Sequence, residues 1–382
     1  MQTVFQLPTR IVFGVGSIDS LGQECAALGK NALIVTGAHS ARDTGLLDRV
    51  EAQLSEKGIK STAFERIKPN PDYATIDEAG KLVRDGGIDL IIGLGGGSAM
   101  DAAKAIRMAA SSGKPVWDHF TAGSDAGCDG PLAELVLVPT MAGTGSEASI
   151  VSVVMNPDNH EKRAMRTPIF YPSVSIVDPQ LTVSLSAWRT AEGAIDMFCH
   201  VFEPYVTADT VSEISDGFME TVMRAAVNAL PRALADPTDL EARGTLSWVS
   251  TLALSGVMRL GGGSGLFSCH GFAQALNGHY RDLGHGGTLA YMMPAWLESM
   301  AAQRPERLKK AGLAVFGTED CAGALLKWIK DAGVGQSLRE VGVSRGDLTA
   351  IADSAWNTQA MVKKHPGGMT PESVLAMYER VY

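Results

Sequence analysis

The stretch IDLIIGLGGGSAMD, residues 88–101, joins an apolar run to a glycine-rich turn. The run at 88–94 has the length and composition of a strand that is buried on both faces, as in a parallel sheet. The turn at 95–98 is glycine-rich, and a helical pattern follows it to about Ala109. A strand, a turn and a helix in this order indicate an α/β fold with parallel strands.

The same alternation extends outward from this stretch. Further strands are predicted at 31–36, 60–66 and 134–139, and helices at 44–58 and 75–86. The pattern changes near Pro179, after which the segments are long and helical: 188–205, 208–230, 239–259, 267–278, 288–303 and 320–333. The sequence therefore predicts a parallel-sheet α/β domain over 1–180 and an all-α domain over 181–382.

Composition agrees with this division and excludes several classes of function. A chain of 382 residues exceeds the usual size of a single hydrophobic core. Acidic residues outnumber basic ones by 42 to 33 without a basic stripe, which argues against nucleic acid as a partner. No apolar run is long enough for a membrane helix. The five cysteines are scattered without a CxxC pair, so we expect reduced thiols in a cytoplasmic protein.

Two glycine loops follow predicted strands and are candidates for binding a polar ligand. In the loop at 95–98, backbone N–H groups and the start of a helix can bind a phosphate without a basic side chain. The loop PTMAGTGSE, residues 139–147, adds hydroxyl groups. Each could also be a plain turn, but two such loops at the carboxyl ends of parallel strands favour a site. A third glycine run, at 261–265, follows a helix, and we interpret it as an interhelical loop.

Four residues in the helical half form a candidate metal site. Asp196 and His200 lie four apart in a helical stretch and therefore share one face. His270 and His285 complete a set of three imidazoles and one carboxylate, which suits Zn²⁺ or Fe²⁺. Each residue alone is weak evidence, since a lone histidine near a helix is more often a surface group or a satisfied core group.

Taken in order, the motifs resemble the iron-containing (group III) alcohol dehydrogenase family over nearly the whole chain. They are PTRIVFGVG from Pro8, PNP from Pro69, GGGS with Asp101 and Lys104, PTMAGTGSE, Asp178-Pro179, the Asp196/His200/Glu203 helix, His270 and His285-Gly286. The resemblance implies a Rossmann-like dinucleotide-binding domain and a helical domain, in a dehydroquinate synthase-like architecture. It further implies a homodimer and hydride transfer between a nicotinamide cofactor and a small alcohol or aldehyde.

The resemblance also assigns site residues. Asp196, His200, His270 and His285 would be ligands of one divalent metal, Fe or Zn, acting as a Lewis acid on the substrate oxygen. No side-chain acid or base is assigned. The residues that would contact the dinucleotide are Gly37, Ser40, Gly96, Gly97, Ser98, Asp101, Thr140, Met141, Thr144, Ser146 and Lys162.

The segment after the first predicted strand bears on the choice of cofactor. Many NAD-preferring members carry an acidic residue there, whereas this chain has Gly37 followed by Ala38, His39 and Ser40. The segment is similar to GGGS of the NADP-dependent butanol dehydrogenase and aldehyde reductase branch. A carboxylate would repel a 2′-phosphate, so we expect NADP to be preferred, with NAD as the alternative.

Two departures from the family pattern leave other functions open. Gln274 stands where the family usually has a histidine, and glutamine cannot exchange a proton near neutral pH. His270 and His285 are fifteen residues apart where fourteen is usual, and His279 could partly replace the missing histidine. The alternatives are a dehydroquinate synthase-like lyase and a nucleotide-binding protein whose metal site has decayed.

Overall fold

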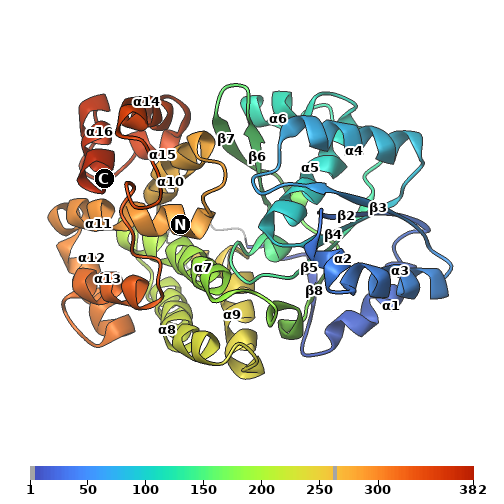
Figure 1. Ribbon diagram of the computed structural model, residues 1–382, viewed down its shortest axis with the longest axis horizontal. Coiled ribbons are helices and arrows are strands. Elements are labelled where there is room, and N and C mark those ends of the chain that lie inside the picture. Colours follow the sequence, from blue (N-terminus) through green and yellow to red (C-terminus); the bar gives the residue numbers. More distant parts are fainter. Residues whose placement is uncertain (1–4, 261–264) are drawn as a thin grey trace.

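The computed structural model describes residues 5–260 and 265–382, and its first half is built on a parallel sheet (Figure 1). Six strands pair in the order β1-β8-β5-β4-β2-β3, and every neighbouring pair is parallel. The strands are β1 (Arg10–Phe13), β2 (Asn31–Gly37), β3 (Lys60–Ile67), β4 (Leu90–Gly95), β5 (Glu134–Pro139) and β8 (Val174–Val177). The predicted α/β sheet is thus confirmed.

Helices cover both faces of this sheet, which explains why its central strands are apolar without alternation. In β2, Leu33 and Val35 belong to one buried cluster, whereas Ala32 and Ile34 belong to another on the opposite face. The first cluster includes residues of α4 (Tyr73–Asp85), α5 (Gly97–Ser112) and α6 (Val116–Ala122); the second includes α1 (Leu21–Ala26) and α3 (Leu46–Glu56). A short helix, α2 (Ser40–Asp43), follows β2.

Besides the short helices α1 and α6, two short strands and a hairpin of this half were not predicted from the sequence. The strands β1 and β8, which pair at one side of the sheet, are only four residues long, too short to give a clear periodic signal. An antiparallel hairpin of β6 (Val151–Asn156) and β7 (Glu161–Arg166) forms a separate two-stranded sheet beside α5. This hairpin forms part of the site described below.

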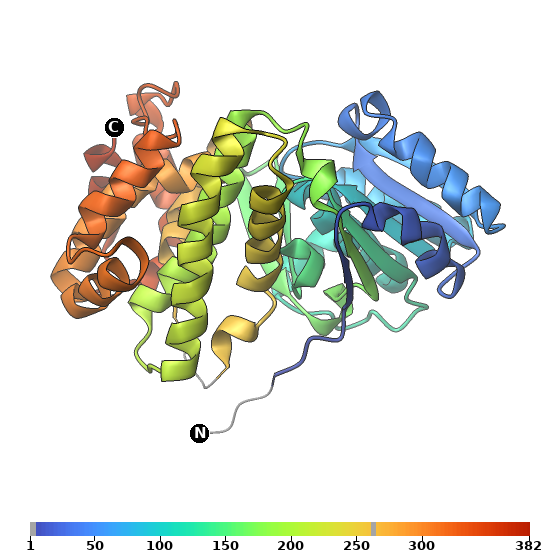
Figure 2. The same ribbon diagram turned by 90° about the horizontal axis from the view of Figure 1, so that it is seen from below.

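The second half is helical (Figures 1 and 2). Its helices pack around one large apolar cluster. They are α7 (Ala187–Thr207), α8 (Glu213–Ala235), α9 (Leu240–Ala253), α10 (Ser268–His279), α11 (His285–Gln303), α12 (Pro305–Ala311), α13 (Cys321–Asp331), α14 (Leu348–Thr358), α15 (Ala360–Lys363) and α16 (Pro371–Arg380). The domain boundary at residue 180 stays a prediction; the sheet's last strand ends at Val177 and α7 begins at Ala187. None of the helices described combines the length and apolar character needed to cross a bilayer. The predicted interhelical loop at 261–265 lies, apart from Gly265, outside the described residues.

Candidate functional site

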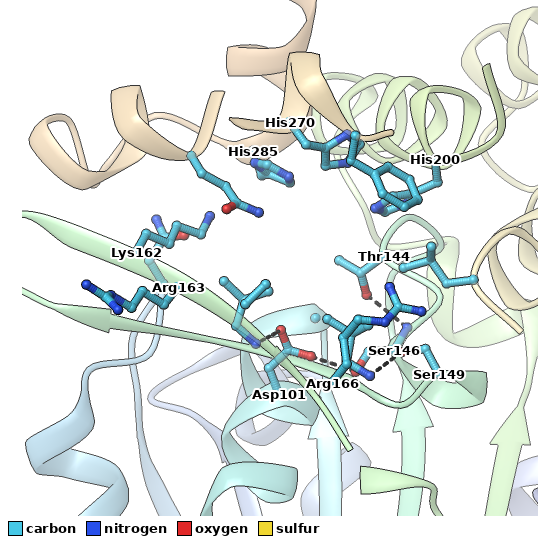
Figure 3. A pocket seen from close by; sticks show the side chains of 18 of the residues that line it. Asp101, Thr144, Ser146, Ser149, Lys162, Arg163, Arg166, His200, His270 and His285 are labelled. Atoms are coloured by element: carbon cyan, nitrogen blue, oxygen red, sulfur yellow. Dashed lines mark hydrogen bonds between the residues drawn. The ribbon is translucent and has the colours of Figure 1, made fainter. Parts of the chain in front are cut away.

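A cavity of about 410 Å³ lies between the carboxyl edge of the sheet, the β6–β7 hairpin and the helical half (Figure 3). Its volume falls within the range of small-molecule and cofactor sites. One wall contains residues of α5 and of the loop after β5, and the opposite wall contains the three histidines of the candidate metal site. Predicted site residues that line it are Gly97, Ser98, Asp101, Thr144, Ser146, Lys162, Asp196, His200, His270 and His285.

The wall formed by α5 and the loop after β5 is called the sheet wall, and the wall that carries the three histidines is called the helical wall. The sheet wall begins with the amino end of α5. Gly97 and Ser98 are its first residues and line the cavity, so the free backbone N–H groups of the first turn lie at this wall. A Cβ on Gly97 would lie 2.4 Å from Cγ2 and 2.9 Å from Oγ1 of Thr144. Only glycine therefore allows the α5 turn and the loop after β5 to approach each other this closely.

Buried polar contacts hold the loop after β5 in place. The Ser146 hydroxyl donates to Asp101 Oδ1 at 2.7 Å, and the N–H of Val153 donates to Asp101 Oδ2 at 3.0 Å. Lys104 is fully buried, and its Nζ donates to the carbonyl oxygens of Ser146, Ser149 and Val151. Burial lowers the pKa of Lys104 to about 8. Asp101 and Lys104 thus fix the shape of this wall.

The other predicted cofactor residues lie outside the lining of the cavity. Gly37 ends β2 and Ser40 begins α2, both at the carboxyl edge of the sheet. Gly96 precedes α5, with its backbone extended. The N–H of Thr140 donates to the carbonyl of Gly95 at 2.9 Å. Met141 packs toward α7: a Cβ on Gly193 of that helix would lie 3.2 Å from Met141 Cε.

On the helical wall, three imidazoles surround one carboxylate oxygen. The Nε2 atoms of His200 and His270 each lie 3.6 Å from Asp196 Oδ1, and Nε2 of His285 lies 3.8 Å from it. Ligand atoms of Asp196, His270 and His285 all fall within 4.8 Å of one another. Asp196 Oδ1 and His270 Nε2 are buried, and neither has a hydrogen-bond partner within the described residues. Buried polar atoms are rarely left unpaired, so this arrangement fits a divalent cation.

Close helix packing brings these side chains together. A Cβ on Gly193 would lie 2.1 Å from the carbonyl oxygen of Ala142, so α7 contacts the loop after β5 one turn before Asp196. A Cβ on Gly286 would lie 1.9 Å from the carbonyl oxygen of Glu192. The start of α11 therefore packs directly on α7, which leaves His285 facing Asp196. Backbone-to-backbone contacts of this kind require glycine.

Burial and mutual charge set the protonation of the cluster. Burial alone would raise the pKa of the Asp196 carboxyl, but His200, His270 and His285 hold that pKa well below its ordinary value. Burial lowers the pKa of His200 to about 4. It also lowers the pKa of His285, as does the nearby Lys162. His200 and His285 are therefore neutral imidazoles facing an ionised carboxylate, the protonation that metal binding requires.

A second set of residues orients two of the imidazoles. His270 Nδ1 lies 2.5 Å from Oε1 of the fully buried Glu203, whose Oε2 accepts from the N–H groups of Cys269 and His270. Burial would lower the pKa of His270, but Glu203 and then Asp196 raise it to about 9. Hydrogen bonds to the outer ring nitrogen are typical of metal-binding histidines, since they direct the other nitrogen at the metal. A metal bound at His270 would displace the proton that its raised pKa keeps on the ring at neutral pH.

Asn277 orients the ring of His285 in the same way. Its Oδ1 lies 3.1 Å from His285 Nδ1 and also accepts from Lys162 Nζ at 3.1 Å. Sequence reasoning did not identify Asn277, and it quoted Glu203 only as part of the α7 motif. Asn277 lies seven residues after His270, two turns along the same face of α10, and this spacing was the available signal.

The structure shows where the two departures from the family pattern lie, namely the wider spacing of His270 and His285 and the glutamine at 274. The wider spacing does not displace His285, which follows a loop at 280–284 and begins α11 with its Nε2 3.8 Å from Asp196 Oδ1. Gln274 lines the cavity one turn after His270, and its buried Oε1 has no partner among the described residues. His279 does not replace the missing histidine: it stacks on His160 with ring centroids 5.0 Å apart. Cys199 and Cys269 are buried packing residues, as expected.

Comparison with known proteins gives one consistent match. The family model "Iron-containing alcohol dehydrogenase" matches residues 8–179, and the model of the C-terminal part of that family matches 190–382. The chain is 31% identical to NADH-dependent butanol dehydrogenase B of Clostridium acetobutylicum, over 91% of each protein. It is 30% identical to an NADPH-dependent aldehyde reductase of Escherichia coli, over 90% of each. A crystal structure of NADH-dependent butanol dehydrogenase A from Thermotoga maritima superposes with a TM-score of 0.93 at 29% identity, covering 100% of this chain and 98% of that one.

Proposed function

The chain belongs to the iron-containing alcohol dehydrogenase family, whose members use a metal and NAD(P) to interconvert alcohols and aldehydes, and from this premise we propose how its own residues act. Asp196, His200, His270 and His285 hold one divalent metal, iron or zinc. The residues of the sheet wall hold the dinucleotide. Membership of this family favours an oxidoreductase over the dehydroquinate synthase-like lyase, which the sequence left open as an alternative.

One observation carries the metal assignment: three Nε2 atoms lie within 3.8 Å of a buried carboxylate oxygen that has no partner within the described residues. One carboxylate and three imidazoles suit Fe²⁺ or Zn²⁺ better than Mg²⁺ or Ca²⁺, which prefer oxygen ligands. Glu203 and Asn277 orient His270 and His285 so that both Nε2 atoms face Asp196. A protein whose metal site had decayed would have no need of these orienting contacts, so they argue against that alternative.

The sheet wall supports the cofactor assignment through its backbone. The first turn of α5 offers N–H groups to a pyrophosphate at Gly96, Gly97 and Ser98, and the helix terminus adds a partial positive charge. Thr144 and Ser146 add hydroxyl groups. Lys162, on β7, adds a positive charge between the two walls. A chain of net charge −9 can thus bind an anionic cofactor without a basic surface.

When bound, the metal polarises the substrate oxygen as a Lewis acid, and the nicotinamide donates or accepts the hydride. The chain's own residues position the metal, the substrate and the nicotinamide. Glu203 and Asn277 fix two imidazole rings. No side chain is assigned as acid or base. Gln274 cannot exchange a proton, but its free Oε1 can accept a hydrogen bond and orient a bound group.

The end of β2 supports a preference for NADP. Gly37 carries no carboxylate, and Ser40 at the start of α2 offers a hydroxyl group and a backbone N–H to a 2′-phosphate. The relatives include an NADPH-dependent aldehyde reductase as well as NADH-dependent butanol dehydrogenases. Kinetics with both cofactors test this preference, and a higher kcat/KM with NADH would refute it.

A homodimer and a cytoplasmic location complete the proposal. β1 is an edge strand with free backbone groups along its outer side, and the flanking Phe5 and Val15 are 45% and 56% exposed. We expect light scattering to give twice the monomer mass of 40.3 kDa. All five cysteines are free thiols, which fits a reducing compartment.

The test of the function combines metal analysis with turnover. Protein purified without chelator is expected to contain one iron or zinc per chain and to oxidise NADPH with a short aldehyde. A chelator should abolish both properties, and added Fe²⁺ or Zn²⁺ should restore them. Turnover that survives complete metal removal would refute the proposed role of the cluster.

A further inference from the structure

An aromatic ring stands beside two of the candidate metal ligands. The ring centroid of Phe267 lies 5.3 Å from that of His270 and 6.1 Å from that of His200, edge to face in both pairs. Phe267 lines the cavity and keeps part of its surface free, whereas the three residues after it, Ser268 to His270, are all buried. A free apolar surface thus lies next to the proposed metal position.

The backbone holds this ring in a fixed place. The N–H of Leu266, the preceding residue, donates to Thr207 Oγ1 of α7 at 2.6 Å. A Cβ on Gly265 would lie 2.0 Å from the carbonyl oxygen of Pro204, so the segment before α10 packs directly on α7. A side chain that is anchored in this way can present a defined surface to a ligand.

Neither helix capping nor core packing explains the phenylalanine. Phe267 directly precedes α10, at a position where Ser, Thr, Asp or Asn commonly caps the free N–H groups of a helix. Phenylalanine cannot do so, and Glu203 Oε2 accepts from the N–H groups of Cys269 and His270 instead. Phe267 also belongs to none of the three apolar clusters formed by the described residues. Its free surface therefore points to contact with a ligand.

The two ends of the row of histidines differ in polarity (Figure 3). His285 stands at the end nearest Lys162, where Asn277 Oδ1 lies 3.1 Å from both the His285 Nδ1 and the Lys162 Nζ atoms. His200 stands at the other end, which is the end that Phe267 contacts. An alkyl group loses contact with water beside the ring, whereas beside the ammonium it would remove water from a charge. The alkyl part of a ligand is therefore favoured at the Phe267 end.

The ring lies apart from the residues proposed to hold the dinucleotide. Those residues belong to the sheet domain and the hairpin, between Gly37 and Lys162, whereas Phe267 belongs to the helical wall. Under the proposed function the substrate oxygen lies at the metal. The groups bonded to the reacting carbon then lie within reach of a ring that contacts two ligands of that metal.

We propose that Phe267 determines which substrates fit: its ring packs on the alkyl group of the reacting carbon and excludes groups that are branched or cyclic at the next carbon. Preferred substrates are then straight-chain aldehydes and primary alcohols. This inference rests on the proposed function, because it takes the substrate oxygen to lie at the metal. Packing on the ring contributes through buried apolar area, and forcing a bulkier group into filled space carries a penalty.

The experiment compares butanal with cyclohexanecarbaldehyde on metal-loaded enzyme with NADPH. We expect wild type to reduce butanal with a kcat/KM at least about tenfold higher. Phe267→Ala should lower kcat/KM for butanal about tenfold, because a packed surface is lost, and raise it for cyclohexanecarbaldehyde at least about tenfold, because space is gained. Phe267→Leu, of intermediate size, should lie between the two. Opposite changes on two substrates cannot come from a general loss of folding.

Metal content, cofactor kinetics and a surface variant are the controls. Elemental analysis should give the same metal content in wild type and Phe267→Ala, and KM for NADPH should not change. Phe218→Ala removes an exposed ring from α8 and should alter the reduction of neither aldehyde. Parallel losses on both aldehydes would overturn the inference. A raised KM for NADPH in Phe267→Ala would overturn it as well, because the ring would then contact the nicotinamide.

Calorimetry with two unreactive amides, butanamide and cyclohexanecarboxamide, on the NADPH-bound protein separates this inference from the proposed function. Wild type should bind butanamide more tightly, and Phe267→Ala should reverse the order. If neither aldehyde is reduced but the order reverses, the role of Phe267 stands and the redox function fails. If both aldehydes are reduced with the same preference in wild type and Phe267→Ala, the inference fails and the proposed function stands. Neither turnover nor amide binding would refute both.

Discussion

The two walls of the cavity hold their groups by different physical means. The sheet wall presents backbone N–H groups and short hydroxyl side chains, and it depends on the absence of a side chain at Gly97. The helical wall presents four ionisable side chains, of which His270 and His285 are each oriented by a buried partner. The sheet wall should therefore be sensitive to added volume, whereas the helical wall should be sensitive to a lost ligand.

Loss of a ligand from the helical wall should have the largest effect. His270→Ala removes an imidazole whose Nε2 faces Asp196, and we expect the metal to be lost and kcat/KM to fall by about 1000-fold. Elemental analysis and aldehyde reduction measure the two effects. His279→Ala is the control, since this residue stacks on His160 and lies outside the cavity lining. A metal-replete, active His270→Ala protein would contradict the assignment.

Added volume on the sheet wall should have the next largest effect. In Gly97→Ala the new methyl group would lie 2.4 Å from Thr144 Cγ2, so one of the two loops must move. We expect kcat/KM for the cofactor to fall about 100-fold while the metal content stays unchanged. Adding Thr144→Ser, which removes Cγ2, should restore part of the loss. Gly217→Ala, where a Cβ would meet nothing within 4 Å, serves as the control.

Weakening a support on the helical wall should have a smaller effect. Glu203→Gln keeps the shape of the side chain but removes the charge that faces His270 Nδ1. We expect the metal affinity to fall by about 10- to 100-fold, the range typical of residues that orient metal ligands. Titration with Zn²⁺ against a competing chelator measures it. An affinity equal to that of wild type would show that Glu203 does not act through His270.

A charge added at the end of β2 should have the smallest effect. In Gly37→Asp the new Cβ would meet only the carbonyl of Ile67 at 3.5 Å, so the fold can accept it. We expect KM for NADPH to rise about tenfold, because like charges near a protein surface repel each other by about 1 to 4 kcal/mol at 4 Å. KM for NADH should change little. A parallel rise in both values would mean that the 2′-phosphate does not lie beside Gly37.

Much of the fold could be predicted because its signals are local. The apolar run before Gly95 and the glycine turn after it identified the central strand and the start of α5. The strands β1 and β8 were missed because they are short and depend on pairing with each other across more than 160 residues. The β6–β7 hairpin was missed as well, since one side of it faces a cavity rather than a core.

The site could be predicted only in part. The spacing of Asp196 and His200 on one helix face is visible in the sequence, and the resemblance supplied His270 and His285. The role of Asn277 depends on which groups it meets in space.

The central claim is that the helical wall holds a metal on which turnover depends. The most direct measurement is the metal content of wild-type and Asp196→Ala protein, both purified without chelator, with NADPH-dependent aldehyde reduction measured on the same samples. We predict about one iron or zinc per chain and turnover in wild type, and neither in the variant. Metal-free wild-type protein that still reduces aldehydes, or a variant that retains both metal and turnover, would contradict the account.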